Sequence, residues 1–186
     1  MKKETILLIV VTLAVGALAG VIFTNSQKAA APAAPGNQSV AAAPAVNYQQ
    51  KISALEGILA KDPNNRNAWV QLGHNYFDSN QPMKAIEAYD KALKMNPNDS
   101  NVLTDQGVMF RRVGWFDKAI SNFTKANELN PNHLQSLFNL GIVYRDDLRD
   151  VAMAKEAWTK YLSIAPPGQG ADQVRTMIEH MESGHQ

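Results

Sequence analysis

The chain of 186 residues contains no cysteine. This absence excludes a disulfide framework, thiolate zinc sites, C-x-x-C redox chemistry and covalent attachment of a c-type haem. It also excludes a lipid anchor attached through cysteine. An excess of charge of one sign is lacking too, because 18 basic and 17 acidic residues leave a formal net charge of +1. Nucleic acid is therefore not expected as a partner, since binding to phosphates needs a cationic face.

The sequence also lacks the short motifs that mark common enzyme sites. It has no G-x-x-x-x-G-K-S/T loop, no strand-flanked G-x-G-x-x-G and no H-E-x-x-H. Its four histidines lack the spacing of metal ligands. Asp146, Asp147 and Asp150 are close together, but no glycine-bearing calcium loop accompanies them. We therefore predict a protein that is not an enzyme, with no catalytic residue, cofactor, bound metal or small-molecule substrate.

One long apolar run is present, and it lies near the N-terminus. Residues 1–4 carry two lysines, and residues 5–23 follow without a charge. As a helix this run would span about 28 Å, which nearly matches the hydrocarbon core of a bilayer. We predict a cytoplasmic N-terminus at 1–4 and a transmembrane signal anchor at 5–23. A signal peptide cleaved after Ala19 is the alternative, because Ala17-Leu18-Ala19 has the small-x-small pattern of a cleavage site.

Residues 24–46 differ in composition from everything that follows them. They include nine alanines and three prolines, and Lys28 is their only charged residue. Such a segment has too little large apolar surface to offset the entropy of ordering the chain. We therefore predict a disordered linker at 24–46, which would tether a folded domain to the membrane.

A period of 34 residues becomes visible when the sequence is aligned on its later prolines. It divides the chain into three units, residues 66–99, 100–133 and 134–168, and the third unit has one extra residue between Asp146 and Val151. Each unit has the apolar spacing of two amphipathic helices, and the prolines end the second helix. The residues that recur in phase and define the repeat are Trp69, Leu72, Gly73, Tyr76, Ala85, Tyr89, Ala92, Pro97, Gly107, Phe110, Ala119, Phe123, Ala126, Pro131, Leu140, Gly141, Tyr144, Ala154, Trp158 and Pro166.

This pattern resembles the tetratricopeptide repeat family, and three copies in phase make the resemblance specific. The resemblance implies an all-α fold, a right-handed solenoid of three helix pairs. A cap helix is predicted in residues 47–65. It resembles the second helix of a unit and would cover the first unit. A second cap helix and a tail are predicted in residues 169–186.

Local residue types also predict how the two helices of a unit meet. Gly73 and Ala85, with their counterparts in the other units, are expected to let the two backbones approach closely. Asn80 and Gly114 lie between the helices of their units, where a residue of left-handed conformation is expected. The third unit has neither residue at this point, so we predict a longer and less regular turn there.

The family resemblance also implies a binding surface. In tetratricopeptide repeat proteins, ligand contacts come mainly from five positions of each first helix, which line a concave groove. On this chain the positions hold Asn67, Val70, His74, Phe77, Asp78, Asn101, Thr104, Val108, Arg111, Arg112, Gln135, Phe138, Ile142, Arg145 and Asp146. They predict an apolar floor beside three arginines, which suits an amphipathic or extended protein segment with some acidic residues. The alternative is that Val108, Phe138 and Ile142 simply pack between neighbouring helices.

The order of anchor, linker and repeats resembles bacterial membrane-anchored tetratricopeptide proteins. This resemblance implies a single-pass protein of the inner membrane whose C-terminal domain lies in the periplasm. The third unit and the C-terminal cap are similar to tetratricopeptide subunits of cytochrome c maturation complexes. We therefore expect a non-enzymatic, membrane-tethered module for protein–protein interaction. The alternative is a structural scaffold or a self-assembling component of a cell-envelope complex.

Overall fold

The structure is a computed structural model that describes residues 47–184. The predicted N-terminal segment at 1–4, the anchor at 5–23 and the linker at 24–46 lie outside the described residues, as do residues 185–186. Among residues 47–184, no helix combines the length and the apolar character that a membrane crossing requires.

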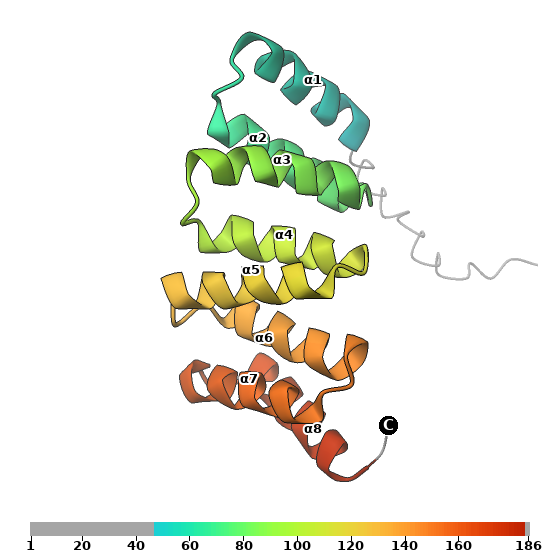
Figure 1. The fold of residues 1–186 in the computed structure, drawn as a ribbon, viewed down its shortest axis with the longest axis vertical. Coiled ribbons are helices and arrows are strands. Elements are labelled where there is room, and N and C mark those ends of the chain that lie inside the picture. Colours follow the sequence, from blue (N-terminus) through green and yellow to red (C-terminus); the bar gives the residue numbers. More distant parts are fainter. Residues whose placement is uncertain (1–46, 185–186) are drawn as a thin grey trace, which may run out of the picture. The chain divides into compact units, whose positions relative to one another are not determined.

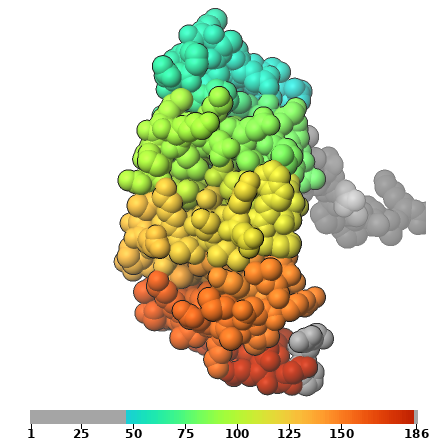
Figure 2. Space-filling view, in the orientation of Figure 1, coloured from blue at the N-terminus to red at the C-terminus, as the bar shows by residue number. Residues whose placement is uncertain are grey.

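The described residues form eight α-helices and one π-helical segment, and they contain no strand. The helices follow one another in a stack in chain order (Figure 1). Figure 2 shows the same order in the packed side chains, so that each unit meets mainly its neighbours in sequence. The elements are α1 (Tyr48–Lys61), α2 (Arg66–Asp78), α3 (Pro82–Met95), α4 (Ser100–Arg112), α5 (Phe116–Leu129), α6 (Leu134–Ile142), η1 (Val143–Asp147), α7 (Val151–Ile164) and α8 (Gln169–Glu182). The predicted all-helical repeat fold is thus confirmed.

The first helix of each unit begins at a polar cap. The side chain of Asn65 accepts the backbone N–H of Ala68, and Asp99 does the same for Val102, at 3.0 and 3.1 Å. In the third unit His133 takes this role, because its Nδ1 accepts the N–H of Ser136 at 3.2 Å. Such caps satisfy backbone donors that have no partner within the helix. They fix where α2, α4 and α6 start.

Each glycine of a first helix makes room for an aromatic ring of the second helix. A Cβ atom at Gly73 would overlap the ring of Tyr89, and one at Gly141 would overlap the indole of Trp158. The same relation holds in the second unit, where Phe123 covers the glycine. All three aromatic residues are fully buried. Each glycine, predicted to let two backbones approach closely, thus accommodates a large side chain of the second helix.

The turns between the two helices differ among the units as the sequence indicated. Asn80 and Gly114 adopt left-handed conformations, with φ of 56° and 77°, which confirms that prediction. In the third unit α6 continues into the π-helical segment η1, and Arg149 takes the left-handed conformation with φ of 58°. The extra residue is therefore absorbed partly by the wider turn of η1.

Two backbone hydrogen bonds show that the connection between the helices is one residue longer in the third unit than in the first. The carbonyl of Tyr76 accepts the N–H of Gln81, five residues later, at 2.8 Å. In the third unit the carbonyl of Tyr144 accepts the N–H of Asp150, six residues later, also at 2.8 Å. The second helix, α7, consequently starts from the same kind of contact as α3 despite the longer connection.

The two end helices belong to incomplete units. Helix α1 packs on α2, and its Ile52 precedes Ile86 of α3 by one period, so α1 corresponds to a second helix. Helix α8 packs on α7 and buries Ala171 and Val174, as a first helix would. The stack therefore contains the first helix of each of the three units, and α8 corresponds to the first helix of a fourth unit.

Candidate ligand-binding face

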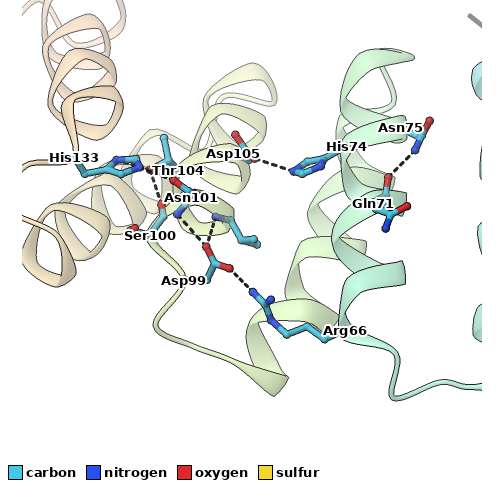
Figure 3. Close-up of polar contacts among 11 residues, drawn as sticks. Arg66, Gln71, His74, Asn75, Asp99, Ser100, Asn101, Thr104, Asp105 and His133 are labelled. Atoms are coloured by element: carbon cyan, nitrogen blue, oxygen red, sulfur yellow. Dashed lines mark hydrogen bonds and ion pairs between the residues drawn. The ribbon is translucent and has the colours of Figure 1, made fainter.

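The first helices of the units share one surface, which polar contacts across the helices define. His74 of α2 donates from Nε2 to Oδ2 of Asp105 in α4, at 3.1 Å. His133, which caps α6, donates from Nε2 to Oδ1 of Asn101 in α4, at 2.9 Å (Figure 3). Arg111 of α4 pairs with Asp147 of η1. We call the surface formed by α2, α4, α6 and η1 the A-helix face.

Most of the predicted ligand residues lie on the A-helix face with accessible side chains. Six are exposed, namely Asn67, His74, Asp78, Asn101, Arg112 and Gln135. Eight are half-buried, namely Val70, Phe77, Val108, Arg111, Phe138, Ile142, Arg145 and Asp146.

Thr104 is the exception among the predicted ligand residues. It is only 2% exposed, and its hydroxyl donates to the carbonyl of Ser100 at 2.8 Å. The same hydroxyl lies 3.5 Å from Nδ1 of His133 (Figure 3). The prediction that Thr104 contacts a ligand is therefore wrong, because the side chain is already enclosed between α4 and the cap of α6.

The three arginines of the face do not form the cationic rim that the sequence suggested. Arg111 pairs with Asp147, and its guanidinium also lies 3.8 Å from a carboxylate oxygen of Asp146. Arg145 pairs with Asp146. Arg112 forms no ion pair among residues 47–184. Its guanidinium lies 4.6 Å from the ring centroid of Phe77. The acids at 146 and 147 thus neutralise two of the three cations, and the expected preference for an acidic segment loses its basis.

An apolar section of the face lies around α6. The ring of Phe138 lies 6.2 Å from that of Tyr161, and both residues are half-buried. Tyr161 stands where the other units have the buried residues Ala92 and Ala126. A Cβ atom at Gly170 of α8 would lie 2.9 Å from the Tyr161 hydroxyl, so this tyrosine extends toward α8. Tyr161 is not among the residues predicted for the surface, although a large aromatic residue in an alanine position is a signal that the sequence contains.

A separate crevice of about 500 Å³ lies between α1, α2 and α3, with Trp69, Leu72 and Tyr76 in its lining. The corresponding crevice one unit later is about 360 Å³. There Gln106 donates to Asp90 at 2.6 Å and accepts from Asn122 at 2.8 Å, which ties the walls together. The larger crevice has two lysines and two glutamates in its lining, so its charge selects no class of ligand.

No group of three or more His, Asp or Glu side chains in the described part of the chain is arranged to hold a metal ion. The three aspartates that are close together in the sequence, at positions 146, 147 and 150, each have a partner within the fold. Asp146 and Asp147 pair with arginines, and Asp150 caps α7 by accepting the N–H of Met153 at 3.0 Å.

The pKa values of the two histidines on the A-helix face are shifted in opposite directions. The hydrogen bond to Asp105 raises the pKa of His74 above 6.5, and the charges of nearby aspartates add to this effect. Burial lowers the pKa of His133. Because the folded-state pKa of His74 is raised, its contact stabilises the fold below about pH 6.5 and is lost as the pH rises through that raised pKa.

Titration of the imidazole resonances by NMR checks this expectation. Asp105→Asn should move the midpoint of His74 downward and leave that of His133 below 6.5. A wild-type midpoint for His74 at or below that of His133 contradicts the assignment.

Comparisons with known proteins agree with this geometry. Two family models described as tetratricopeptide repeat match residues 67–99 and 88–121. A comparison with curated protein sequences found no match. The crystal structure of MamA is similar, with 27% sequence identity, a TM-score of 0.67, and coverage of 74% of this chain and 79% of that one.

Two further solved structures share the fold. YrrB, described as a TPR protein with an unusual peptide-binding site, is 24% identical with a TM-score of 0.64, over 69% of this chain and 66% of that one. MamA from Desulfovibrio magneticus RS-1 is 21% identical with a TM-score of 0.61, over 63% of this chain and 66% of that one.

Proposed function

Because two tetratricopeptide repeat models match residues 67–99 and 88–121, and the structure of MamA is similar in fold, we propose that the chain is a tetratricopeptide repeat protein. We propose further that it is a non-enzymatic protein–protein interaction module whose A-helix face holds a segment of a partner protein. One observation carries this proposal. Half-buried apolar side chains from three successive first helices, among them Phe77, Val108 and Phe138, lie on the same surface. A partly exposed apolar row with polar groups beside it suits an amphipathic helix or an extended segment with apolar anchors.

The polar groups on this face support binding rather than catalysis. His74 is engaged with Asp105, and His133 with Asn101, so both histidines join neighbouring helices. Groups held in such contacts position the helices relative to one another. The contact of His133 with Asn101, at the start of α6, gives the bound segment a rigid surface there, which reduces the entropy lost on binding.

We extend the proposal to the location of the module. Residues 5–23 would anchor it in the bacterial inner membrane, and residues 24–46 would tether the described domain in the periplasm. The support is the charge-free apolar run preceded by two lysines. An alkaline phosphatase fused after His185 should then be active in cells, and an inactive fusion would reject this topology. A role in cytochrome c maturation stays a prediction, which co-purification of an apocytochrome c with the full chain would test.

Site-specific crosslinking tests the proposed function directly. We expect a photoreactive amino acid at Val108, in the full-length chain in its own cells, to form adducts with one or a few partner proteins. The same residue at Thr124, which is exposed on α5, serves as the control. The photoreactive amino acid is also placed at Phe138. If neither the position 108 nor the position 138 variant forms adducts, or if the position 124 variant forms the same adducts, the A-helix face is rejected as the binding surface.

A further inference from the structure

The hydroxyl of Tyr89 is buried without a hydrogen-bond partner among the described residues. Tyr89 is fully buried, and its ring lies over Gly73. A buried hydroxyl with no partner destabilises a fold, because it has lost its hydrogen bonds to water. The next unit has Phe123 at the same position, equally buried over its own glycine. Packing over the glycine therefore does not require the hydroxyl, and its presence needs another explanation.

The surroundings of Tyr89 place it beneath the A-helix face, between α2 and α4. The ring of His74 meets the ring of Tyr89 edge-on, with 5.8 Å between the centroids. His74 itself is hydrogen-bonded to Asp105 on the neighbouring helix. Burial raises the pKa of Tyr89, and the negative charges of Asp105 and Asp78 raise it further. The hydroxyl thus lies in the field of two carboxylates that belong to the exposed face.

These two carboxylates give the α2–α4 section of the face negative charges that no lysine or arginine of the described residues pairs with. Asp78 lies one helical turn after His74, and Asp105 lies on the facing helix. Neither forms an ion pair with a lysine or an arginine among residues 47–184, and the partner of Asp105 is His74 alone. Arg112 bounds this section, where its guanidinium is held by the ring and the carbonyl of Phe77. By contrast, the acids of η1 are paired with arginines.

We propose that the α2–α4 section is a subsite for one lysine or arginine side chain of the bound segment, formed by Asp78, Asp105 and the Tyr89 hydroxyl. This inference rests on the proposed function. The basic group takes the place of His74 beside Asp105, and His74 turns away from the ring of Tyr89. The ligand's N–H groups then donate to the carboxylate and to the tyrosine oxygen, so the hydroxyl gains the partner that it lacks in the free protein.

The rest of the face indicates where the remainder of the segment lies. Phe138 and Ile142 on α6 are half-buried and apolar. A segment with its basic residue between α2 and α4 would place apolar side chains on α6. The predicted ligand thus combines apolar anchors with a basic residue, whereas the sequence alone suggested an acidic one.

Selection from a random peptide library displayed on phage, against the full-length chain, tests the chemistry of the subsite. We expect selected peptides to be enriched in apolar residues and in lysine or arginine at a fixed spacing from them. Selection against Asp78→Asn plus Asp105→Asn should retain the apolar enrichment and lose the basic one. The matched control, Asp117→Asn plus Glu128→Gln, removes two exposed acids from α5 and should leave the basic preference intact.

The possible outcomes separate the two proposals. If the wild-type chain selects no peptide, the proposed function fails. If it selects apolar peptides without a basic residue, or if the double variant keeps the basic preference, the subsite is rejected while the proposed function stands.

A second measurement isolates the hydroxyl. Tyr89→Phe should weaken binding of a selected peptide by about 5-fold, the size of one hydrogen bond, while the thermal midpoint stays equal or rises. Replacing the basic residue of the peptide by norleucine should abolish this difference between the variant and the wild type. Tyr48→Phe, which removes a hydroxyl from α1 outside the A-helix face, should bind as wild type does. A Tyr89→Phe variant with unchanged affinity would overturn the role of the hydroxyl.

Discussion

Replacing Trp158 with alanine is expected to lower the free energy of unfolding by about 3–5 kcal/mol. The indole is fully buried in α7 and occupies the space that Gly141 leaves open on α6. Its Nε1–H donates to the carbonyl of Phe138 at 3.1 Å, and the guanidinium of Arg145 lies 5.0 Å from the ring centroid. Removal therefore opens a cavity and takes away the hydrogen bond that the indole donates to this carbonyl. Urea titration followed by far-UV circular dichroism measures the change.

Trp115 provides the matched control, because it is a tryptophan of the same chain that is 39% exposed. Trp115→Ala should cost no more than about 1 kcal/mol. Equal losses for the two variants would contradict the packing described here. Since a stack of repeats is held mainly by neighbouring contacts, the loss at Trp158 should first appear as separate unfolding of the third unit and α8.

A double-mutant cycle tests the fit between the glycine and the indole. Gly141→Ala alone should destabilise by about 1–3 kcal/mol, because the added methyl group overlaps the indole of Trp158. In the Trp158→Ala background the same methyl group enters the cavity, so the cost should disappear. Additive effects would show that the two positions do not share this space.

Introducing glutamate at both Phe138 and Ile142 is expected to weaken binding of a partner segment by at least about 100-fold. Both side chains are half-buried on the A-helix face, four residues apart on α6. Covering two carboxylates with an apolar ligand costs several kcal/mol, and about 2.7 kcal/mol already corresponds to this loss. Fluorescence anisotropy with a peptide selected on the wild-type chain measures the affinity, and circular dichroism confirms the fold of the variant.

Thr159→Glu plus Ser163→Glu is the matched control for this pair. It adds the same two charges at the same spacing, on exposed positions of α7. The control should bind as wild type does. A folded Phe138→Glu plus Ile142→Glu variant that also binds normally would show that these two residues only pack between helices, which was the alternative in the sequence.

The local features of this fold could be predicted because they depend on residues close together in the chain. Asn65 and Asp99 begin their helices by accepting an N–H three residues later. Asn80 and Gly114 take the left-handed conformations that their residue types permit. The 34-residue period repeats these signals in phase. The all-helical repeat fold and the conformation of these turn residues therefore followed from the sequence alone.

The chemistry of the face was decided only by the tertiary structure. Arg111 and Asp147 are 36 residues apart in the chain, yet they form an ion pair. This pairing neutralises the positive charge of Arg111, which the sequence predicted to be available to a ligand. Thr104 occupies an expected ligand position but is buried against the cap of α6. The unpaired hydroxyl of Tyr89 becomes visible only once α2, α3 and α4 are packed together. Which groups remain free depends on the side chains that neighbouring helices bring alongside, and a repeat pattern specifies the helices but not those partners.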